Sequence, residues 1–141
     1  MLKQALISEF KHEAASTRKM LEKVPFDKAG WKPHEKSYPL ARMAGHVAEI
    51  TNWVTATLTT DGLDFAKGEY KPFSPSSKEE LMDLFEKSYQ EALQTLEGAS
   101  DAAMMENWTL RNGDHVIFTM PRLATLRSFV MNHLIHHRGQ L

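Results

Sequence analysis

Apolar residues recur every three or four positions along four separate stretches of the sequence, a spacing typical of amphipathic helices. Each stretch would leave its apolar stripe in water unless it packed against the others. The pattern therefore predicts an all-α fold, a four-helix bundle. The stripe residues are Leu2, Leu6, Phe10, Ala14, Thr17 and Leu21; then Leu40, Met43, Val47, Ile50, Val54 and Leu58; then Leu81, Leu84, Phe85, Ser88, Ala92 and Leu96; and finally Leu123, Leu126, Val130, Leu134 and Leu141.

Local signals predict where these helices begin and end. The first should end before Pro25, because proline disfavours helix in the residue that precedes it. The second should begin near Ser37 to Pro39, with proline in its first turn, and stop at Asp61-Gly62. Ser77 and Glu80 have the spacing of a capping box, in which each side chain accepts a hydrogen bond from the other's exposed amide.

The segments between the helices differ in character. Residues 26–37 are expected to form a loop. Residues 62–76 contain Gly68, Pro72 and Pro75 and are expected to form a long crossover loop. Residues 107–119 contain Asn112-Gly113 between two short β-prone runs, which predicts a short β-hairpin before the last helix. Pro121 should open that helix.

Composition narrows the class of protein. With 141 residues the chain is long enough for one domain with its own core, and we expect a single domain over residues 1–141. The formal net charge of -1 offers no general attraction for nucleic acid or an anionic membrane. No apolar run approaches the ~20 residues of a membrane span, and charges interrupt the region where a signal peptide would be apolar. A cytoplasmic protein that uses neither partner is therefore expected.

Three histidines crowd the segment "NHLIHHRGQL" at the end of the sequence. On a helical wheel of ~100° per residue, His137 falls ~20° from the centre of the last apolar stripe, His133 ~60° and His136 ~120°. His133 and His137 are four residues apart, so both imidazoles emerge on one face and can share a metal ion. His136 should point outward.

A third ligand for such an ion would have to come from another helix. His46 is the best candidate, because it lies in the middle of the second helix on the apolar face that also carries Trp53. Three neutral imidazoles would leave coordination positions open, as catalytic sites do. Hydrogen-bonded core histidines are the alternative, and spacing alone weighs the two about equally. His12, His34 and His115 have weaker claims.

Other candidate site residues are less specific. Glu49 lies one turn after His46 and could orient it or act as a base, although a solvated carboxylate at the rim is the more ordinary interpretation. Trp53 could line a pocket or simply pack. Arg138 could pair with a substrate anion, or form a structural salt bridge. Because the chain has no cysteine, a thiol would have to arrive as a cosubstrate.

The sequence resembles the DinB-like (DinB/YfiT-like) superfamily over essentially its full length. The motifs that carry the resemblance are "NHLIHHRGQL" preceded by "LATLRSFVM", W-x-P-H-x-K-S from Trp31 to Ser37, and "ARMAGHVAEI" around His46. The resemblance implies an up-down-down-up four-helix bundle, often a homodimer. It also implies a divalent metal, commonly nickel or zinc, held by three histidines, here His46, His133 and His137.

The resemblance also implies a range of activities on small molecules. Some relatives are metal-dependent hydrolases, and others are transferases or isomerases that use a low-molecular-weight thiol. Family members usually continue past HHRGQL, which leaves two alternatives for the end of this chain: truncation at Leu141, or loss of a tail that covers the site.

Three functional hypotheses follow. The first is a thiol-dependent S-transferase in which the metal favours the thiolate and the thiolate attacks an electrophilic carbon. The second is a hydrolase that uses water at the same metal. The third is a metal-binding or ligand-binding stress protein without turnover. For either enzyme, Glu49 is the only nearby acidic candidate for a base.

Overall fold

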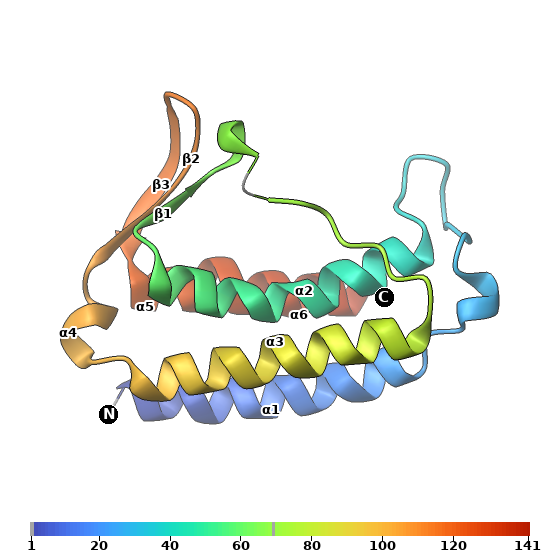
Figure 1. Ribbon diagram of the computed structural model, residues 1–141, viewed down its shortest axis with the longest axis horizontal. Coiled ribbons are helices and arrows are strands. Elements are labelled where there is room, and N and C mark those ends of the chain that lie inside the picture. The colour runs from blue at the N-terminus through green and yellow to red at the C-terminus, as the bar shows by residue number, and fades with distance from the viewer. Residues whose placement is uncertain (1, 69) are drawn as a thin grey trace.

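The computed structural model of the protein describes residues 2–68 and 70–141. In this part of the chain, four long helical stretches lie side by side and make up most of the molecule (Figure 1). Helix α2 packs against α3 and against the last helical stretch, while α1 packs against α3. The long stretches are α1 (Leu2–Glu22), α2 (Leu40–Thr59), α3 (Lys78–Gly98) and a final continuous stretch of α5 (Arg122–Ala124), η3 (Thr125–Met131) and α6 (Asn132–Gln140).

The apolar stripes of the sequence form the core between these helices. Phe10 and Leu21 of α1 are almost completely buried, as are Phe85 of α3 and Leu134 of α6. Leu2 is an exception to the prediction, because 68% of its surface is exposed at the free end of α1. Among the described residues, no helix is both long enough and apolar enough to cross a membrane.

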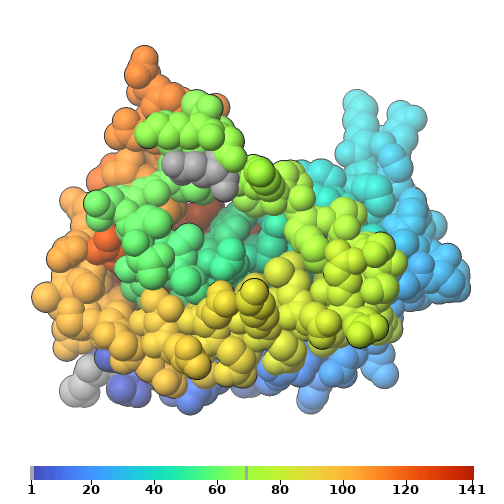
Figure 2. All heavy atoms as spheres, viewed as in Figure 1, coloured from blue at the N-terminus to red at the C-terminus, as the bar shows by residue number. Residues whose placement is uncertain are grey.

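Helix α2 is buried on more than its apolar stripe because its small residues admit close neighbours. A Cβ on Gly45 would lie 2.5 Å from the carbonyl oxygen of Phe73 and 2.6 Å from Cδ of Pro75. The crossover between α2 and α3 therefore lies directly on α2, as a strap. In Figure 2 this crossover spans the molecule above α2, and the surface is hollowed between them.

The start of α3 is capped, but only half of the predicted capping box forms. The hydroxyl of Ser77 accepts a hydrogen bond from the amide of Glu80 at 3.1 Å, as expected. The carboxylate of Glu80 instead accepts from the amide of Ser76 at 3.2 Å and from its hydroxyl at 2.7 Å. The glutamate thus reaches one residue further back than the motif requires.

A small sheet corrects the all-α expectation. The predicted hairpin is present as β2 (Asn107–Asn112) and β3 (His115–Pro121). Its turn is centred one residue later than Asn112-Gly113, since Asn112 pairs with His115 and Gly113 adopts a positive φ of 62°.

A third strand, β1 (Gly62–Asp64), pairs in parallel with β2 and was not predicted. It is only three residues long, so no alternation of apolar and polar residues marks it. The carboxylate of Asp64 accepts a hydrogen bond from the amide of Gly113 at 2.9 Å, which ties the crossover to the hairpin turn. The expected loops contain two short helices, η1 (Phe26–Lys28) and η2 (Phe65–Lys67), and a further one, α4 (Asp101–Met104), lies between α3 and the hairpin.

The last helical stretch is not a regular α-helix throughout. Pro121 precedes it, as predicted, but Thr125–Met131 form a π-helical segment, whose backbone hydrogen bonds span five residues. Each π-helical residue rotates the chain by a smaller angle than an α-helical residue does. The apolar stripe therefore shifts around the helix axis relative to the α-helical prediction. Thr125 and Met131 are buried together with the predicted stripe residues Leu126 and Val130. The α-helix resumes at Asn132, just before the histidines.

Candidate metal centre

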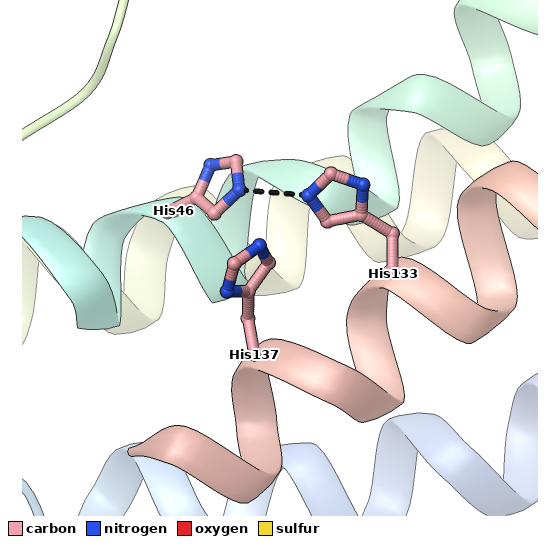
Figure 3. Close-up of side chains that lie close together, drawn as sticks. All are labelled: His46, His133 and His137. Carbon is pink, nitrogen blue, oxygen red and sulfur yellow. Dashed lines mark hydrogen bonds between the residues drawn. The ribbon is translucent and has the colours of Figure 1, made fainter.

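Three imidazoles meet between α2 and α6 (Figure 3). One ring nitrogen from each of His46, His133 and His137 lies within 4.8 Å of the others. Nε2 of His46 and Nε2 of His133 are 3.1 Å apart, and Figure 3 shows a nitrogen of His137 directed at the gap between them. Within residues 2–68 and 70–141, this is the one set of three metal-ligating side chains brought so close together.

Two of the three imidazoles are oriented by an acceptor on their outer nitrogen. Nδ1 of His46 donates to a carboxylate oxygen of Glu49 at 2.8 Å, and Nδ1 of His137 donates to the amide oxygen of Gln140 at 2.7 Å. Each acceptor holds a proton on the Nδ1 of its ring, so that Nε2 is the nitrogen available to face the other imidazoles. A carboxylate or carbonyl behind a ligating histidine is the usual outer partner in metal sites.

Burial keeps the histidines of α6 in the form that binds metals. The pKa of His133 is lowered from its ordinary value to about 4, first by burial and then by the neighbouring imidazoles of His137 and His46. Burial also lowers the pKa of His137, against the opposing effect of its bond to Gln140. Both rings are therefore neutral near pH 7, and their nitrogens are available to a cation.

This donor set fits a divalent first-row metal. The atoms are borderline imidazole nitrogens, their lone pairs converge, and outer hydrogen bonds fix the rings of His46 and His137. Zinc and nickel both accept such ligands. Three protein donors leave room for a further ligand, which distinguishes catalytic sites from closed structural ones.

Glu49 belongs to a buried polar network rather than to a solvated rim. Only 8% of its surface is exposed. One oxygen of its carboxylate accepts from His46 and from the hydroxyl of Tyr70 at 2.5 Å, and it lies 3.4 Å from the guanidinium of Arg42. Of the two functional roles considered for Glu49, orientation of His46 is the one that these contacts favour.

Tyr70 and Arg42 also belong to this network, although neither was predicted from the sequence. Arg42 lies on the same face of α2 as His46 and Glu49, and this helical spacing could have indicated it. It donates to the carbonyl of Phe73 at 3.1 Å and to the hydroxyl of Tyr70 at 3.1 Å. Tyr70 lies in the crossover and has no periodic signal. Burial and its bond to Glu49 raise the pKa of Tyr70 to about 12, so it stays a hydrogen-bond donor.

The remaining candidates divide between the site and the rest of the molecule. Trp53 lies edge-on to His46 and His133, with ring centroids 5.7 and 5.0 Å away, and stacks on Phe129 of η3. Arg138 turns to α1 instead, where it forms an ion pair with Glu13 at 2.6 Å. That contact agrees with the structural interpretation of Arg138.

The other histidines lie outside the group. His136 is exposed, as the helical wheel predicted. His12 is exposed on α1 and His115 is exposed on β3. His34 caps a turn, where its Nδ1 accepts from the amide of Lys36 at 3.1 Å.

A cleft of about 530 Å³ opens beside His137. Its walls come from the loop before α2, the first turn of α2 and the end of α6. The lining residues are Trp31, Pro33, Lys36, Ser37, Tyr38, Leu40, Met43, His137, Gln140 and Leu141. The cleft gives a small molecule a route to the edge of the histidine group.

Comparison with known families identifies the family of this chain. The family model described as the DinB superfamily matches residues 9–141, a span that contains all three histidines. The chain belongs to the DinB superfamily. A comparison with curated proteins found no match.

Solved structures similar to this DinB-superfamily chain share its fold at low sequence identity. A DinB-like protein from Bacillus cereus superposes with a TM-score of 0.72 and 22% identity, over 97% of this chain and 86% of that one. A DinB-like protein from Bacillus subtilis has a TM-score of 0.72 and 17% identity, over 96% and 85%. A mycothiol-dependent maleylpyruvate isomerase has a TM-score of 0.69 and 16% identity, over 99% of this chain but only 60% of the isomerase.

Proposed function

We propose that this protein is a metal-dependent enzyme that transfers a low-molecular-weight thiol to a small electrophile. His46, His133 and His137 would hold a zinc or nickel ion, and that ion would lower the pKa of a thiol brought to it. The observation that carries the proposal is the convergence of three ring nitrogens within 4.8 Å beside an open cleft. The chain has no cysteine, so the thiol is a cosubstrate.

The reaction needs little general-base chemistry from the protein. The sulfur of the thiolate would attack the electrophilic carbon, a C–S bond would form, and the leaving group would depart with its electron pair. The thiol proton would pass to solvent. Free thiols have a pKa of about 8.5, so metal binding suffices to ionise them near neutrality.

The state of Glu49 favours thiol attack over hydrolysis. Activation of water commonly uses a free carboxylate or histidine beside the metal. The carboxylate of Glu49 is instead shared by His46, Tyr70 and Arg42. A hydrolase at the same three histidines is the second candidate, favoured by the open position that water could occupy. A metal-binding protein without turnover is the third.

The comparisons add support of a general kind. One protein of similar fold is named as a mycothiol-dependent isomerase, which agrees with thiol chemistry on this scaffold. We further propose that the chain forms a single domain whose long helices make an up-down-down-up bundle. In Figure 1, α2 and α3 run in one direction and α1 and α6 in the other, which supports this topology.

Metal analysis followed by a thiol-transfer assay tests the function. Protein purified without a metal-chelate column should contain close to one zinc or nickel per chain. Chlorodinitrobenzene and glutathione serve as the first electrophile and thiol, followed by other small thiols. Turnover should require the metal and should disappear in His133→Ala. A protein that binds no metal, or whose thiol transfer is indifferent to the metal, would contradict the proposal.

A further inference from the structure

The cleft beside His137 is bounded by a loop that the proposed chemistry leaves unused. Residues 31–38 contain the motif W-x-P-H-x-K-S and form one wall of the cleft. In Figure 2 this loop stands out from the body of the molecule at the upper right, in light blue to cyan. The volume of about 530 Å³ is in the range of small-molecule sites, roughly 300–1,000 Å³.

Hydrogen bonds fix the base and the tip of this loop. The amide of Leu40 donates to the carbonyl of Trp31 at 2.8 Å, and the amide of Ala41 donates to the carbonyl of Ala29 at 3.0 Å. Both bonds anchor the loop to the first turn of α2. At the tip, His34 caps the amide of Lys36. The wall is therefore organised before any ligand arrives, which lowers the entropic cost of binding.

The side chains on this wall are apolar rings and one cation. Trp31 is 59% exposed and Tyr38 is 52% exposed, so both rings offer apolar surface to a molecule in the cleft. Lys36 is the one charged side chain among the described residues that line the cleft, and no carboxylate side chain lines it. The cleft thus combines stacking surfaces with one positively charged side chain.

The wall is also linked to the histidine group. The guanidinium of Arg42 lies over the ring of Tyr38, 5.2 Å from its centroid. The same guanidinium contacts Glu49, which orients His46. Tyr38 is therefore connected to His46 through Arg42 and Glu49, and His137 lines the same cleft.

We propose that this cleft binds a flat apolar molecule that carries one anionic group. Its rings contact Trp31 and Tyr38, its anion lies near Lys36, and its remaining end reaches His137. If the proposed function holds, this molecule is the electrophile. Its role as electrophile rests on the proposed function, whereas its binding in the cleft does not.

Two fluorescent probes with the same ring system isolate the contribution of the charge. Anilinonaphthalene sulfonate carries an anion, and phenylnaphthylamine is the same aromatic framework without it. Both are titrated into metal-free protein with chelator present, so that the result is independent of the metal. The variants are Lys36→Gln, Lys36→Arg and Trp31→Ala. Lys32→Gln is the matched control, because it removes a lysine of the same loop that does not line the cleft.

The expected pattern is specific to the cleft. Wild type should bind the sulfonate up to about fivefold more tightly than the neutral probe, the scale of a partly exposed ion pair. Lys36→Gln should abolish this preference, Lys36→Arg should restore it, and Lys32→Gln should keep it. Trp31→Ala should weaken both probes by about threefold or more. Thermal unfolding shows that each variant is folded.

The opposite results would overturn the inference. These are equal affinity for the two probes in wild type, equal effects of Lys36→Gln and Lys32→Gln, or unchanged binding in Trp31→Ala. If the probes fail while metal-loaded protein transfers thiols, only the cleft assignment is wrong. If the probes bind as expected and no thiol transfer occurs with any metal, the proposed function is wrong and the binding site stands.

Discussion

Each histidine of the group has a different set of partners, so the three side chains contribute unequally. His46 is held by the Glu49 carboxylate, and His137 by the amide of Gln140 at the end of its own helix. His133 has contacts to His46 and to the rings of Trp53 and Phe129. Its position therefore depends on packing, whereas that of the other two depends on hydrogen bonds.

The first prediction concerns the three histidines themselves. His46→Ala, His133→Ala and His137→Ala should each lose most of the bound metal, because two imidazoles seldom retain an ion. Each should also lose the stability that metal gives the folded protein, about 3–4 kcal/mol at metal concentrations a hundred to a thousand times the dissociation constant. Isothermal titration with zinc or nickel measures the first effect, and thermal unfolding the second.

His136→Ala provides the matched control, since this exposed histidine lies on the same helix. It should keep its metal. If the rings are instead hydrogen-bonded core histidines, wild type should bind no metal and the buried variants should be only modestly destabilised.

The second prediction concerns Glu49. Glu49→Ala should weaken metal binding by about 10- to 100-fold, because His46 loses the acceptor that orients its ring. Tyr70→Phe removes one hydrogen bond to the same carboxylate and should have a smaller effect. Competition with a chromogenic chelator gives both affinities. If Tyr70→Phe lost as much metal affinity as Glu49→Ala or more, Glu49 would not be the group that orients His46 for the metal.

The third prediction is a pH dependence of the metal-free protein. The folded pKa of His133 is about 4, against an ordinary value of 6.5, so the unfolded chain binds more protons between these values. Stability is therefore fully present above pH 6.5 and should fall as the pH drops toward 4. The urea midpoint should decrease over this window, and less so in His133→Gln.

His12→Gln is the control for this experiment, because His12 is exposed on α1. It should follow the wild-type curve. An identical acid response in wild type and in His133→Gln would remove His133 as a source of the effect.

At the scale of the elements, the crossover and α2 together supply the residues that surround His46 on the side away from α6. Tyr70 reaches Glu49 only because residues 70–75 lie against α2, and this contact depends on the missing side chain of Gly45. Arg42 reinforces it through the carbonyl of Phe73. The strap and the helix therefore position His46 together.

The fourth prediction follows from that contact. Gly45→Ala places a Cβ 2.5 Å from backbone oxygen, so the strap must shift. Overpacking of this kind costs about 1–3 kcal/mol, which outweighs the gain in helix propensity of up to about 1 kcal/mol. Urea unfolding should show the loss, and metal affinity should fall with it.

Gly139→Ala is the matched substitution, because Gly139 is also helical and a Cβ there meets nothing within 4 Å. Its stability should be unchanged or slightly higher. Equal stability of the two variants would mean that the crossover can move away from α2 with no loss in the free energy of unfolding.

The whole molecule combines two helices far apart in sequence into one site. His46 and His133 are separated by 87 positions, and only the packing of α2 against α6 brings their nitrogens together. The cleft depends on the same packing, since its walls come from residues 31–43 and 137–141. Binding of a metal should therefore stabilise the molecule as a whole.

The fifth prediction concerns assembly. We expect a homodimer, on the family resemblance and on exposed apolar side chains such as Leu2, Met105 and Ile117, which association could cover. Light scattering at micromolar concentration should give about twice the 16.1 kDa of one chain. A single 16.1 kDa species at that concentration would contradict this expectation.

The sequence by itself determined the long helices and the phase of their histidines. Amphipathic periodicity is a local property, so α1, α2, α3 and the hairpin were predicted close to where they lie. The shared face of His133 and His137 also followed from their four-residue spacing, and His46 was selected because it lies on the apolar face of another helix.

Only the tertiary structure decided the features that join distant segments. Tyr70 meets Glu49 across 21 positions, and β1 pairs with β2 across the whole of α3, so no local pattern encodes either contact. The π-helical segment was not predicted either, because the apolar spacing of the sequence was that of an ordinary α-helix. The burial of Glu49 has the same cause: its helix alone would leave it in water, and the strap that covers it comes from elsewhere in the chain.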